Sequence, residues 1–300
     1  MNLPLVSICI PAYNRPIWLK RAILSVIDQQ QASQEIELII SDDSTDLQSQ
    51  QVVNNILSNW PGQWQYFRNI NNLGMSQNWN QAIKLANGSY ILLLHDDDFL
   101  YPNSLQAIIS TLKSQTNLVF LFGVKVVNEH EQILKFQRSR GYLPPKMALI
   151  KVLSNSSFVR FPAIVVAKSA FETVGLFKEN LAEPADLEMW VRLFSKYGVF
   201  CSDQITCAYT VHSQALTMGI FKEKTIDTIL SIFEQASAYL SPEQLAQCQK
   251  RFFHQFILAG AFRMLRRGQI KQFREILQLF ELAQLQHIKS NCFFWIRLGG

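Results

Sequence analysis

The feature that most constrains the fold is the alternation of short apolar runs with longer amphipathic stretches through the first two-thirds of the chain. Four apolar runs have the length and composition of strands, and they lie at residues 5–10, 36–41, 64–69 and 89–94. Amphipathic stretches typical of helices follow them, at residues 17–29, 47–60, 76–86 and 102–113. Strand–helix alternation with links this short indicates βαβ units. We therefore expect an α/β fold with a mostly parallel central sheet that helices cover on both faces.

The pattern loosens after residue 115. Further strands are expected at 118–128, 161–168 and 205–212, and a helix at 185–198. From about residue 222 the sequence is helical. One helix is expected to start at Ser241, where Pro242 occupies the first turn and Gln244 completes a capping box. A last helix is expected from about residue 270 to 286.

Charge also divides the chain. Residues 221–300 hold 11 Lys and Arg against 6 Asp and Glu, whereas residues 1–220 hold 17 of each. The sequence therefore predicts a catalytic domain over 1–220 and a basic helical extension over 221–300. The extension is either a set of solvated helices packed on the domain, or a patch at 262–274 that contacts anionic lipid or a lipid diphosphate acceptor. Nucleic-acid binding is not expected, because the aromatic residues have core-like spacing and no binding motif is present.

The composition is that of a core-forming globular chain, with 48% hydrophobic and 17% charged residues. The five cysteines are scattered without metal-like spacing, which favours reduced thiols in a cytoplasmic protein. The N-terminus has no basic region followed by a long apolar core. No run approaches the roughly 18 apolar residues of a membrane span. We expect a cytoplasmic protein that touches the inner face of the membrane at most peripherally.

Carboxylates gather where the second and fourth strands end, in "DDSTD" (42–46) and "HDDD" (95–98). Ligands of open parallel sheets bind beyond the carboxyl ends of the strands. Adjacent acids repel one another unless a cation compensates, and Mg²⁺ or Mn²⁺ binds through carboxylates and phosphate oxygens. The chain contains no glycine-rich phosphate loop. A diphosphate substrate held through a divalent cation is therefore expected.

Some of these acids have simpler explanations. Asp46 is expected to form an Asx turn and to cap the following helix, and Asp98 to form a turn or to cap the helix that begins near Pro102. Trp79 and Trp190 are expected to be core residues rather than sugar-stacking platforms.

Six segments occur in the order found in one enzyme family. They are "VSICIPAYNRP", "ELIISDDSTD", "NNLGMSQNWNQAI", "GSYILLLHDDDFLYPNSL", "VGLFKENLAEPADLEMWVRL" and "VHSQALT". Over residues 3–218 the chain resembles the family 2 glycosyltransferases of the GT-A fold, which are inverting enzymes that use nucleotide-diphosphate sugars. The resemblance implies a GT-A domain, a UDP-sugar donor and a Mg²⁺ or Mn²⁺ cofactor.

The resemblance also implies residue roles. Tyr13 would lie beside the base, Asp43 would recognise the uracil edge, and Asp96 would lie near the ribose. Asp97 would bind the metal, His212 would lie near the metal and the pyrophosphate, and Asp186 would be the general base. The expected nucleotide-sugar residues are Pro11, Tyr13, Asn14, Asp43, Gly74, Asn78 and Asp96.

The chain departs from the family pattern at four places. His95 replaces the first acid of the D-x-D motif, the second loop lacks a glycine, and Ala185 stands where an acid often precedes the base, with Glu183 close by. Asn78 and Trp79 stand where a basic residue often helps to hold phosphate.

Two assignments stay open on the residues alone. Asp186 is either the base or only a helix N-cap, and Glu188 is its competitor as base. His212 is either a metal ligand or a half-buried strand-end histidine.

Direct inversion needs one base for the acceptor hydroxyl and charge stabilisation on the leaving nucleotide. The expected activity is metal-assisted sugar transfer from a nucleotide-diphosphate sugar to a hydroxyl of a saccharide or lipid-linked acceptor. The alternatives are a catalytically silent sugar-nucleotide binding module and a metal-dependent nucleotidyltransferase.

Overall fold

A central twisted sheet organises the computed structural model, which describes residues 3–29, 34–181, 184–212 and 221–288. Within these ranges ten strands form one sheet, in the order β3-β2-β1-β4-β9-β6-β10-β5, with β7 paired to β6 and β8 to β10. The first four strands are β1 (Val6–Ala12), β2 (Ile36–Asp42), β3 (Gln63–Arg68) and β4 (Tyr90–Leu93). The rest are β5 (Phe99–Leu100), β6 (Val119–Asn128), β7 (Ile133–Gln137), β8 (Gly141–Leu143), β9 (Ile164–Ala167) and β10 (Val199–Val211).

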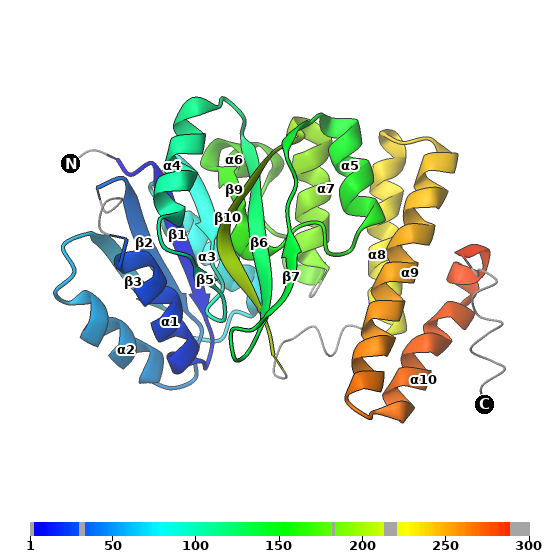
Figure 1. Ribbon diagram of the computed structural model, residues 1–300, viewed down its shortest axis with the longest axis horizontal. Coiled ribbons are helices and arrows are strands. Elements are labelled where there is room, and N and C mark those ends of the chain that lie inside the picture. The colour runs from blue at the N-terminus through cyan, green and yellow to red at the C-terminus, as the bar shows by residue number, and fades with distance from the viewer. Residues whose placement is uncertain (1–2, 30–33, 182–183, 213–220, 289–300) are drawn as a thin grey trace.

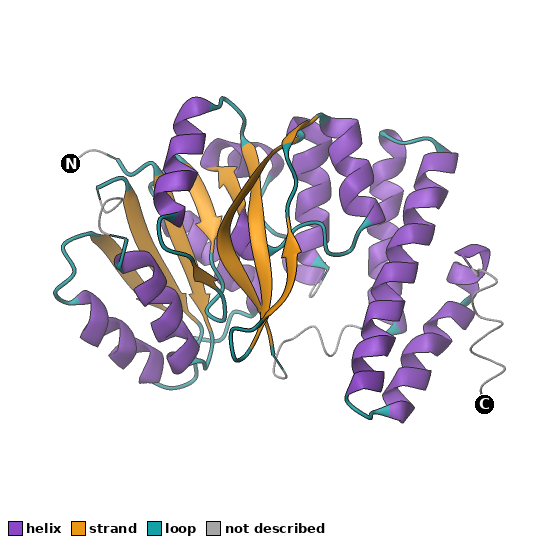
Figure 2. Ribbon diagram, viewed as in Figure 1, coloured by secondary structure: helices purple, strands orange, loops and turns teal. Residues whose placement is uncertain are grey.

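Helices cover both faces of this sheet (Figures 1 and 2). They are α1 (Pro16–Ile27), α2 (Gln48–Leu57), α3 (Met75–Leu85), α4 (Ser104–Ser114), α5 (Pro145–Ser154), α6 (Lys168–Val174) and α7 (Ala185–Tyr197). Every residue of β1 and β2 is buried, as expected for strands covered from both sides.

The first four strands pair in parallel, as the alternation predicts. β1 lies between β2 and β4, and Ala12 at its end is level with Asp42 of β2. The loops that follow β1, β2 and β4 therefore meet at one edge of the sheet. β5, β7, β8 and β9 join antiparallel, so the sheet is mixed with a parallel core.

The later elements differ from the prediction at their ends. Phe161–Ala163 forms a 3₁₀ turn before β9, because Pro162 fits a helical first turn and cannot donate to a sheet. β10 starts six residues before the predicted strand and carries register shifts between Cys201 and Cys207. These irregularities interrupt the apolar alternation by which a strand is recognised. α4 starts at Ser104 because Asn103 is left-handed, with φ 64°.

The C-terminal region is helical, as predicted: α8 (Glu223–Gln235), α9 (Pro242–Arg266) and α10 (Ile270–Gln278). The capping box is confirmed, since Ser241 Oγ accepts from the Gln244 backbone N–H at 3.3 Å and Gln244 Oε1 accepts from the Ser241 N–H at 3.2 Å. The predicted last helix ends early at Gln278, and two 3₁₀ segments, Leu279–Glu281 and Ala283–Ile288, replace its second half.

α9 packs against α5, where Ser154 Oγ donates to Cys248 Sγ at 3.3 Å. The helical extension thus stands beside α5 and α7 (Figure 1). The described cysteines are all buried and unpaired, and Cys292 lies outside the described residues. Across the ranges given above, no helix combines the length and apolar character needed to cross a bilayer.

Candidate active site

A cavity of about 730 Å³ opens where the loops after β1, β2 and β4 meet. Its volume lies within the range typical of small-molecule sites. The sheet loops form one wall, and α7, α8 and α9 form the opposite wall. The cavity brings together the predicted residues Pro11, Tyr13, Asn14, Asp43, Gly74, Asn78, Asp96, Asp97 and Asp186.

Asn14 joins the first two loops. It is left-handed with φ 53°, a conformation that asparagine tolerates better than most residues. Its N–H donates to Ser44 Oγ at 2.8 Å, and its Oδ1 accepts from the Thr45 N–H at 2.9 Å. Tyr13 is about half exposed (48%) at the mouth of the cavity.

Asp43 anchors the loop before α3. Its carboxylate accepts from Asn69 Nδ2 at 3.0 Å, from the Leu73 N–H at 2.8 and 3.0 Å, and from the Gly74 N–H at 2.9 Å. Gly74 has φ 82°, which favours glycine. Asn78 supports the same corner, because its Oδ1 accepts from Asn69 Nδ2 at 3.0 Å. Asp43 therefore fixes the shape of this corner of the cavity, and its four contacts use the acceptor capacity of a carboxylate.

The neighbouring acids in the second loop are structural. Asp42 accepts from Tyr66 Oη at 2.6 Å and from the Ser44 N–H at 2.9 Å. Asp46 accepts from the Gln48 N–H at 2.9 Å. The predicted Asx turn is confirmed, although Leu47 rather than Asp46 occupies the cap position.

The three acids of "HDDD" point in three directions. Asp96 Oδ2 accepts from the Tyr13 N–H at 3.0 Å. Asp97 Oδ2 lies 3.0 Å from Nε2 of His212, so the predicted pair is in contact. Asp98 Oδ1 accepts from the Thr210 N–H of β10 at 2.8 Å. Asp98 forms a turn through its N–H to the His95 carbonyl, but it does not cap α4; the prediction of a cap was wrong because β10 reaches the side chain first.

Burial prevents these acids from all ionising easily. Burial, with a smaller contribution from the charge of Asp97, raises the pKa of Asp96 to about 7. Burial and the charge of Asp97 likewise raise the pKa of Asp98 well above its usual range. Burial also opposes ionisation of Asp97, but the His212 hydrogen bond and the charge of Arg15 outweigh it and lower its pKa.

The residues present fit a divalent cation. Ligand atoms of His95, Asp97 and Asp98 lie within 4.8 Å of one another. Among the described residues, His95 Nε2 and Asp98 Oδ2 are buried without a hydrogen-bond partner. Burial lowers the pKa of His95 to about 4, so its ring is neutral near pH 7. The two carboxylates suit Mn²⁺ or Mg²⁺, and the group contains no soft thiolate ligand.

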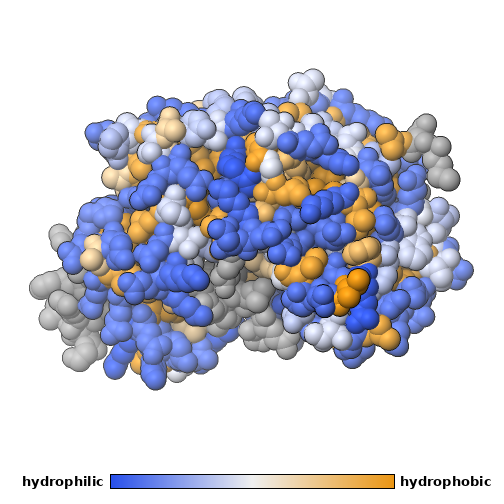
Figure 3. All heavy atoms as spheres, turned by 180° about the vertical axis from the view of Figure 1, so that it is seen from behind, coloured by the Kyte–Doolittle hydropathy of each residue, from blue (hydrophilic) through white to orange (hydrophobic). Residues whose placement is uncertain are grey.

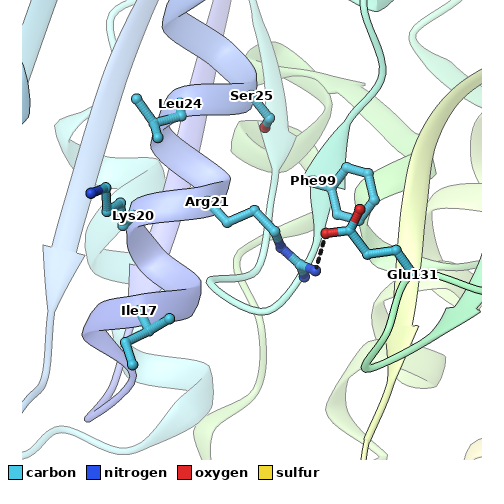
Figure 4. A pocket seen from close by; sticks show the side chains of 7 residues that line it. All are labelled: Ile17, Lys20, Arg21, Leu24, Ser25, Phe99 and Glu131. Carbon is cyan, nitrogen blue, oxygen red and sulfur yellow. Dashed lines mark hydrogen bonds and ion pairs between the residues drawn. The ribbon is translucent and has the colours of Figure 1, made fainter.

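Two arginines that sequence reasoning missed support the acids. Arg15 Nη1 lies 2.7 Å from Asp97 Oδ2 and 3.2 Å from Asp96 Oδ1. Arg21 reaches from α1 behind the cluster, and its Nη2 donates to the Asp97 carbonyl at 2.5 Å and to Thr210 Oγ1 at 2.9 Å. Figure 4 shows Arg21 beside Phe99 and Glu131 in a shallow surface hollow. The position of Arg15 in the first post-strand loop was the available signal.

Asp186 and Glu188 have different surroundings. Asp186 lies in the first turn of α7 and lines the cavity. Pro184 occupies the cap position, so the alternative that Asp186 is only the N-cap was wrong. Burial raises the pKa of Asp186 to about 6. Glu188 is fully buried and pairs with Lys178 at 2.6 Å and Arg192 at 2.8 Å. Glu188 is therefore occupied in an ion-pair network away from the cavity.

The remaining predicted residues are placed as follows. His212 is buried and its ring stacks on Trp18, with centroids 5.1 Å apart. Trp79 and Trp190 are buried, as expected for core residues, and both also line the cavity. Glu183 lies outside the described residues.

Comparison with known proteins decides the family. The family model described as "Glycosyl transferase family 2" matches residues 7–175. The chain belongs to glycosyltransferase family 2. It is therefore an enzyme of glycosyl transfer, and the sequence resemblance is confirmed.

Curated relatives of this family 2 enzyme agree. A glycosyltransferase of Rickettsia typhi is 25% identical over 79% of this chain and 78% of its own length. A Campylobacter jejuni protein named GalNAc(5)-diNAcBac-PP-undecaprenol beta-1,3-glucosyltransferase is 24% identical over 72% of each chain.

Solved structures confirm the GT-A fold. TarS 1-349 from S. aureus, solved with UDP-GlcNAc, aligns with a TM-score of 0.66 at 17% identity, covering 91% of this chain and 81% of that chain. A mannosyltransferase from Pyrobaculum calidifontis, solved with GDP-Man and Mn²⁺, aligns with a TM-score of 0.59 at 14% identity, covering 94% and 76%. The longer TarS chain is covered over 43% of its length.

Proposed function

We propose that this glycosyltransferase moves a sugar, with inversion, from a UDP-sugar to a hydroxyl of a saccharide or lipid-linked acceptor. The observation that carries the proposal is that one cavity is lined by Asp43, Asp96, Asp97 and Asp186 together. The first three come from the sheet loops and the fourth from the facing helix. In that arrangement Asp186 would be the single base, and the acids of the sheet loops would face a nucleotide diphosphate.

The donor would occupy the sheet side. Tyr13 offers a half-exposed ring on which the nucleobase would stack. The loop held by Asp43 and Gly74 would form a rigid border beside that nucleobase. Asp96 would face the ribose. The TarS complex with UDP-GlcNAc and the mannosyltransferase complex with GDP-Man concern proteins of the same fold, and they support a nucleotide-diphosphate sugar as the donor class.

Asp97 would hold the divalent cation together with His95 and Asp98, whose ligand atoms lie within 4.8 Å of its own. His212, whose Nε2 lies 3.0 Å from Asp97 Oδ2, would be a further ligand or would orient that carboxylate. When bound, Mn²⁺ or Mg²⁺ supplies Lewis-acid stabilisation of the leaving diphosphate. The guanidinium of Arg15 already bridges Asp96 and Asp97 and keeps both carboxylates oriented toward the cavity.

Asp186 would remove the proton from the acceptor hydroxyl. A carboxylate acts as a base only when it is ionised, and its raised pKa makes it a stronger proton acceptor than an exposed aspartate. No covalent nucleophile is required for inversion, so one base suffices.

The pH dependence of turnover tests this role. We expect kcat, measured with donor and Mn²⁺ saturating, to be half-maximal near pH 6, because the pKa of Asp186 is raised to about 6. Below that pH the rate should fall roughly tenfold per pH unit as the carboxylate is protonated. Nucleotide release assayed from pH 5 to 8 measures it. A rate that stays level down to pH 5 would remove Asp186 from the role of base.

A catalytically silent sugar-nucleotide binding module remains the second candidate. His95 in place of an acid and the ion pair of Arg15 with Asp97 favour it, because both reduce the negative charge that faces a cation. Calorimetry separates the two, since a silent module binds UDP without turnover and is unaffected by Asp186→Asn.

We also propose that the extension contacts the inner face of the membrane, which would place this enzyme in the cytoplasm. Leu258, Phe262 and Leu265 are 39%, 54% and 40% exposed, and their spacing puts them on one face of α9. Arg266 lies over the Phe262 ring, 4.8 Å from its centroid. An apolar stripe with basic neighbours is suited to an anionic lipid surface.

Vesicle co-sedimentation measures this contact. The protein should pellet with vesicles that contain phosphatidylserine, and Phe262→Ser should reduce the bound fraction several-fold by removing buried apolar area. Equal pelleting of both proteins, or binding that ignores lipid charge and salt, would contradict the proposal.

A further inference from the structure

The wall of the cavity opposite the nucleotide end is mainly apolar. It is formed by α5 and the segment after it and by α8 and α9, and its apolar lining residues are Val152, Phe158, Val159, Ile229, Phe252 and Phe256. Figure 3 shows hydrophobic atoms gathered in the middle of the back face between hydrophilic ones. A wall of this kind exceeds what a sugar hydroxyl needs, so it calls for a ligand with an apolar part.

Arg160 is a positively charged residue that lines this part of the cavity. Within the described part of the chain, Arg15 and Arg160 are the cations that line the cavity, and Arg15 is paired with Asp96 and Asp97. Arg160 Nε is buried without a hydrogen-bond partner. Its guanidinium lies 4.5 Å from the centroid of the Tyr209 ring. The described residues give it no carboxylate within ion-pair distance.

Arg160 also lies close to the general base. Its positive charge lowers the pKa of Asp186, against the larger effect of burial. A ligand group bound to Arg160 would therefore be near the hydroxyl that Asp186 deprotonates. Both groups would belong to neighbouring parts of one acceptor.

Arg263 adds a second cation on the same side of α9. It follows Phe252 and Phe256 by eleven and seven residues, which places all three side chains on one helical face. Arg263 is half-buried, and in the residues that the structure describes it has no carboxylate partner either. Burial lowers its pKa, and the charges of Arg267 and Arg160 lower it further. Arg263 is not itself among the residues that line the cavity. Two cations without a carboxylate partner are stabilised when an anion binds to both.

We propose that Arg160 and Arg263 bind a phosphate ester of the acceptor, while Ile229, Phe252 and Phe256 receive the apolar chain esterified to it. This inference rests on the proposed function, because it assigns the acceptor side of the same cavity. The planar donor fork of arginine matches phosphate oxygens in two-point contacts. The acceptor class is a saccharide joined through phosphate to a lipid chain.

The test uses geranyl phosphate, geraniol and inorganic phosphate as probes, titrated calorimetrically into the full chain saturated with UDP and Mn²⁺. Saturation fills the donor phosphate site first. We expect geranyl phosphate to bind at least about tenfold more tightly than either geraniol or inorganic phosphate, since the phosphate and the chain contribute separately. Equal affinity for inorganic phosphate and geranyl phosphate would overturn the lipid-linked part of the proposal.

The arginine variants complete the test. Arg160→Gln should weaken geranyl phosphate binding about tenfold, Arg263→Gln should act in the same direction, and Arg160→Lys should restore part of the loss. Arg266→Gln on the exposed side of α9 is the matched control and should change nothing. Unchanged binding in the Arg160 and Arg263 variants would refute the site.

UDP affinity distinguishes failure of the proposed function from failure of the acceptor site. Every variant should keep the wild-type affinity for UDP with Mn²⁺, which shows that it is folded with an intact donor site. If the wild-type protein itself fails to bind UDP, the proposed function fails. If it binds UDP but binds geranyl phosphate no more tightly than geraniol or inorganic phosphate, only the acceptor site is overturned.

Discussion

Asp186→Asn should lower kcat by about 10²- to 10⁴-fold, the range that a positioned general base contributes. Asparagine keeps the size of the side chain but cannot accept a proton from the acceptor hydroxyl. Because Asp186 lies on α7, across the cavity from the nucleotide loops, the affinity for UDP should not change. Nucleotide release measures the rate, and calorimetry measures the affinity.

Glu188→Gln is the matched control, two residues further along the same helix. Glu188 is fully buried and bonded to Arg192 and Lys178, so its loss should lower the free energy of unfolding by about 3–5 kcal/mol. The rate per folded molecule should stay near wild type. If Glu188→Gln abolished turnover in folded protein and Asp186→Asn did not, the assignment of the base would be reversed.

Asp97→Asn should remove the metal dependence of the enzyme. The lost Lewis-acid stabilisation of the leaving diphosphate should reduce kcat/KM by about 10²- to 10³-fold. The variant should bind UDP equally with and without Mn²⁺, whereas the wild type should bind UDP more tightly with Mn²⁺ than in EDTA. Titrating UDP under both conditions gives the result.

Asp46→Asn provides the comparison for this variant, because Asp46 carries an exposed carboxylate at the same edge of the sheet and only closes an Asx turn. It should keep the metal effect. A wild-type enzyme with full activity in EDTA, or an Asp97 variant with an unchanged response to Mn²⁺, would contradict the metal site.

The parallel half of the fold and the acidic loops could be predicted from the sequence. Fully apolar runs such as β2 and the loops that follow them have local signatures, and parallel pairing brings Asp43 and Asp96 to the same edge. The division of 1–220 from 221–300 stays a prediction, although α8 and α9 line the same cavity as the sheet loops.

The tertiary contacts could not be predicted. Asp98 looked like a helix cap, but its partner is Thr210, 112 residues away. The sequence around Arg21 and Arg160 gives no sign of their roles. Arg21 reaches the Asp97 carbonyl from α1. Arg160 lines the cavity together with residues of α9, which are distant in the sequence. His95 looked like a replacement for an acid, yet one of its ring nitrogens lies among the candidate ligand atoms, and its Nε2 is buried without a hydrogen-bond partner.

The anomer that forms first during turnover shows whether the sugar is transferred with inversion, by a single displacement. With water as acceptor and an α-linked UDP-sugar as donor, ¹H NMR of the early product distinguishes inversion from retention. We expect the β anomer to appear first and then to mutarotate slowly, because Asp186 would activate the nucleophile for a single displacement. Early accumulation of the α anomer would contradict the single-displacement mechanism.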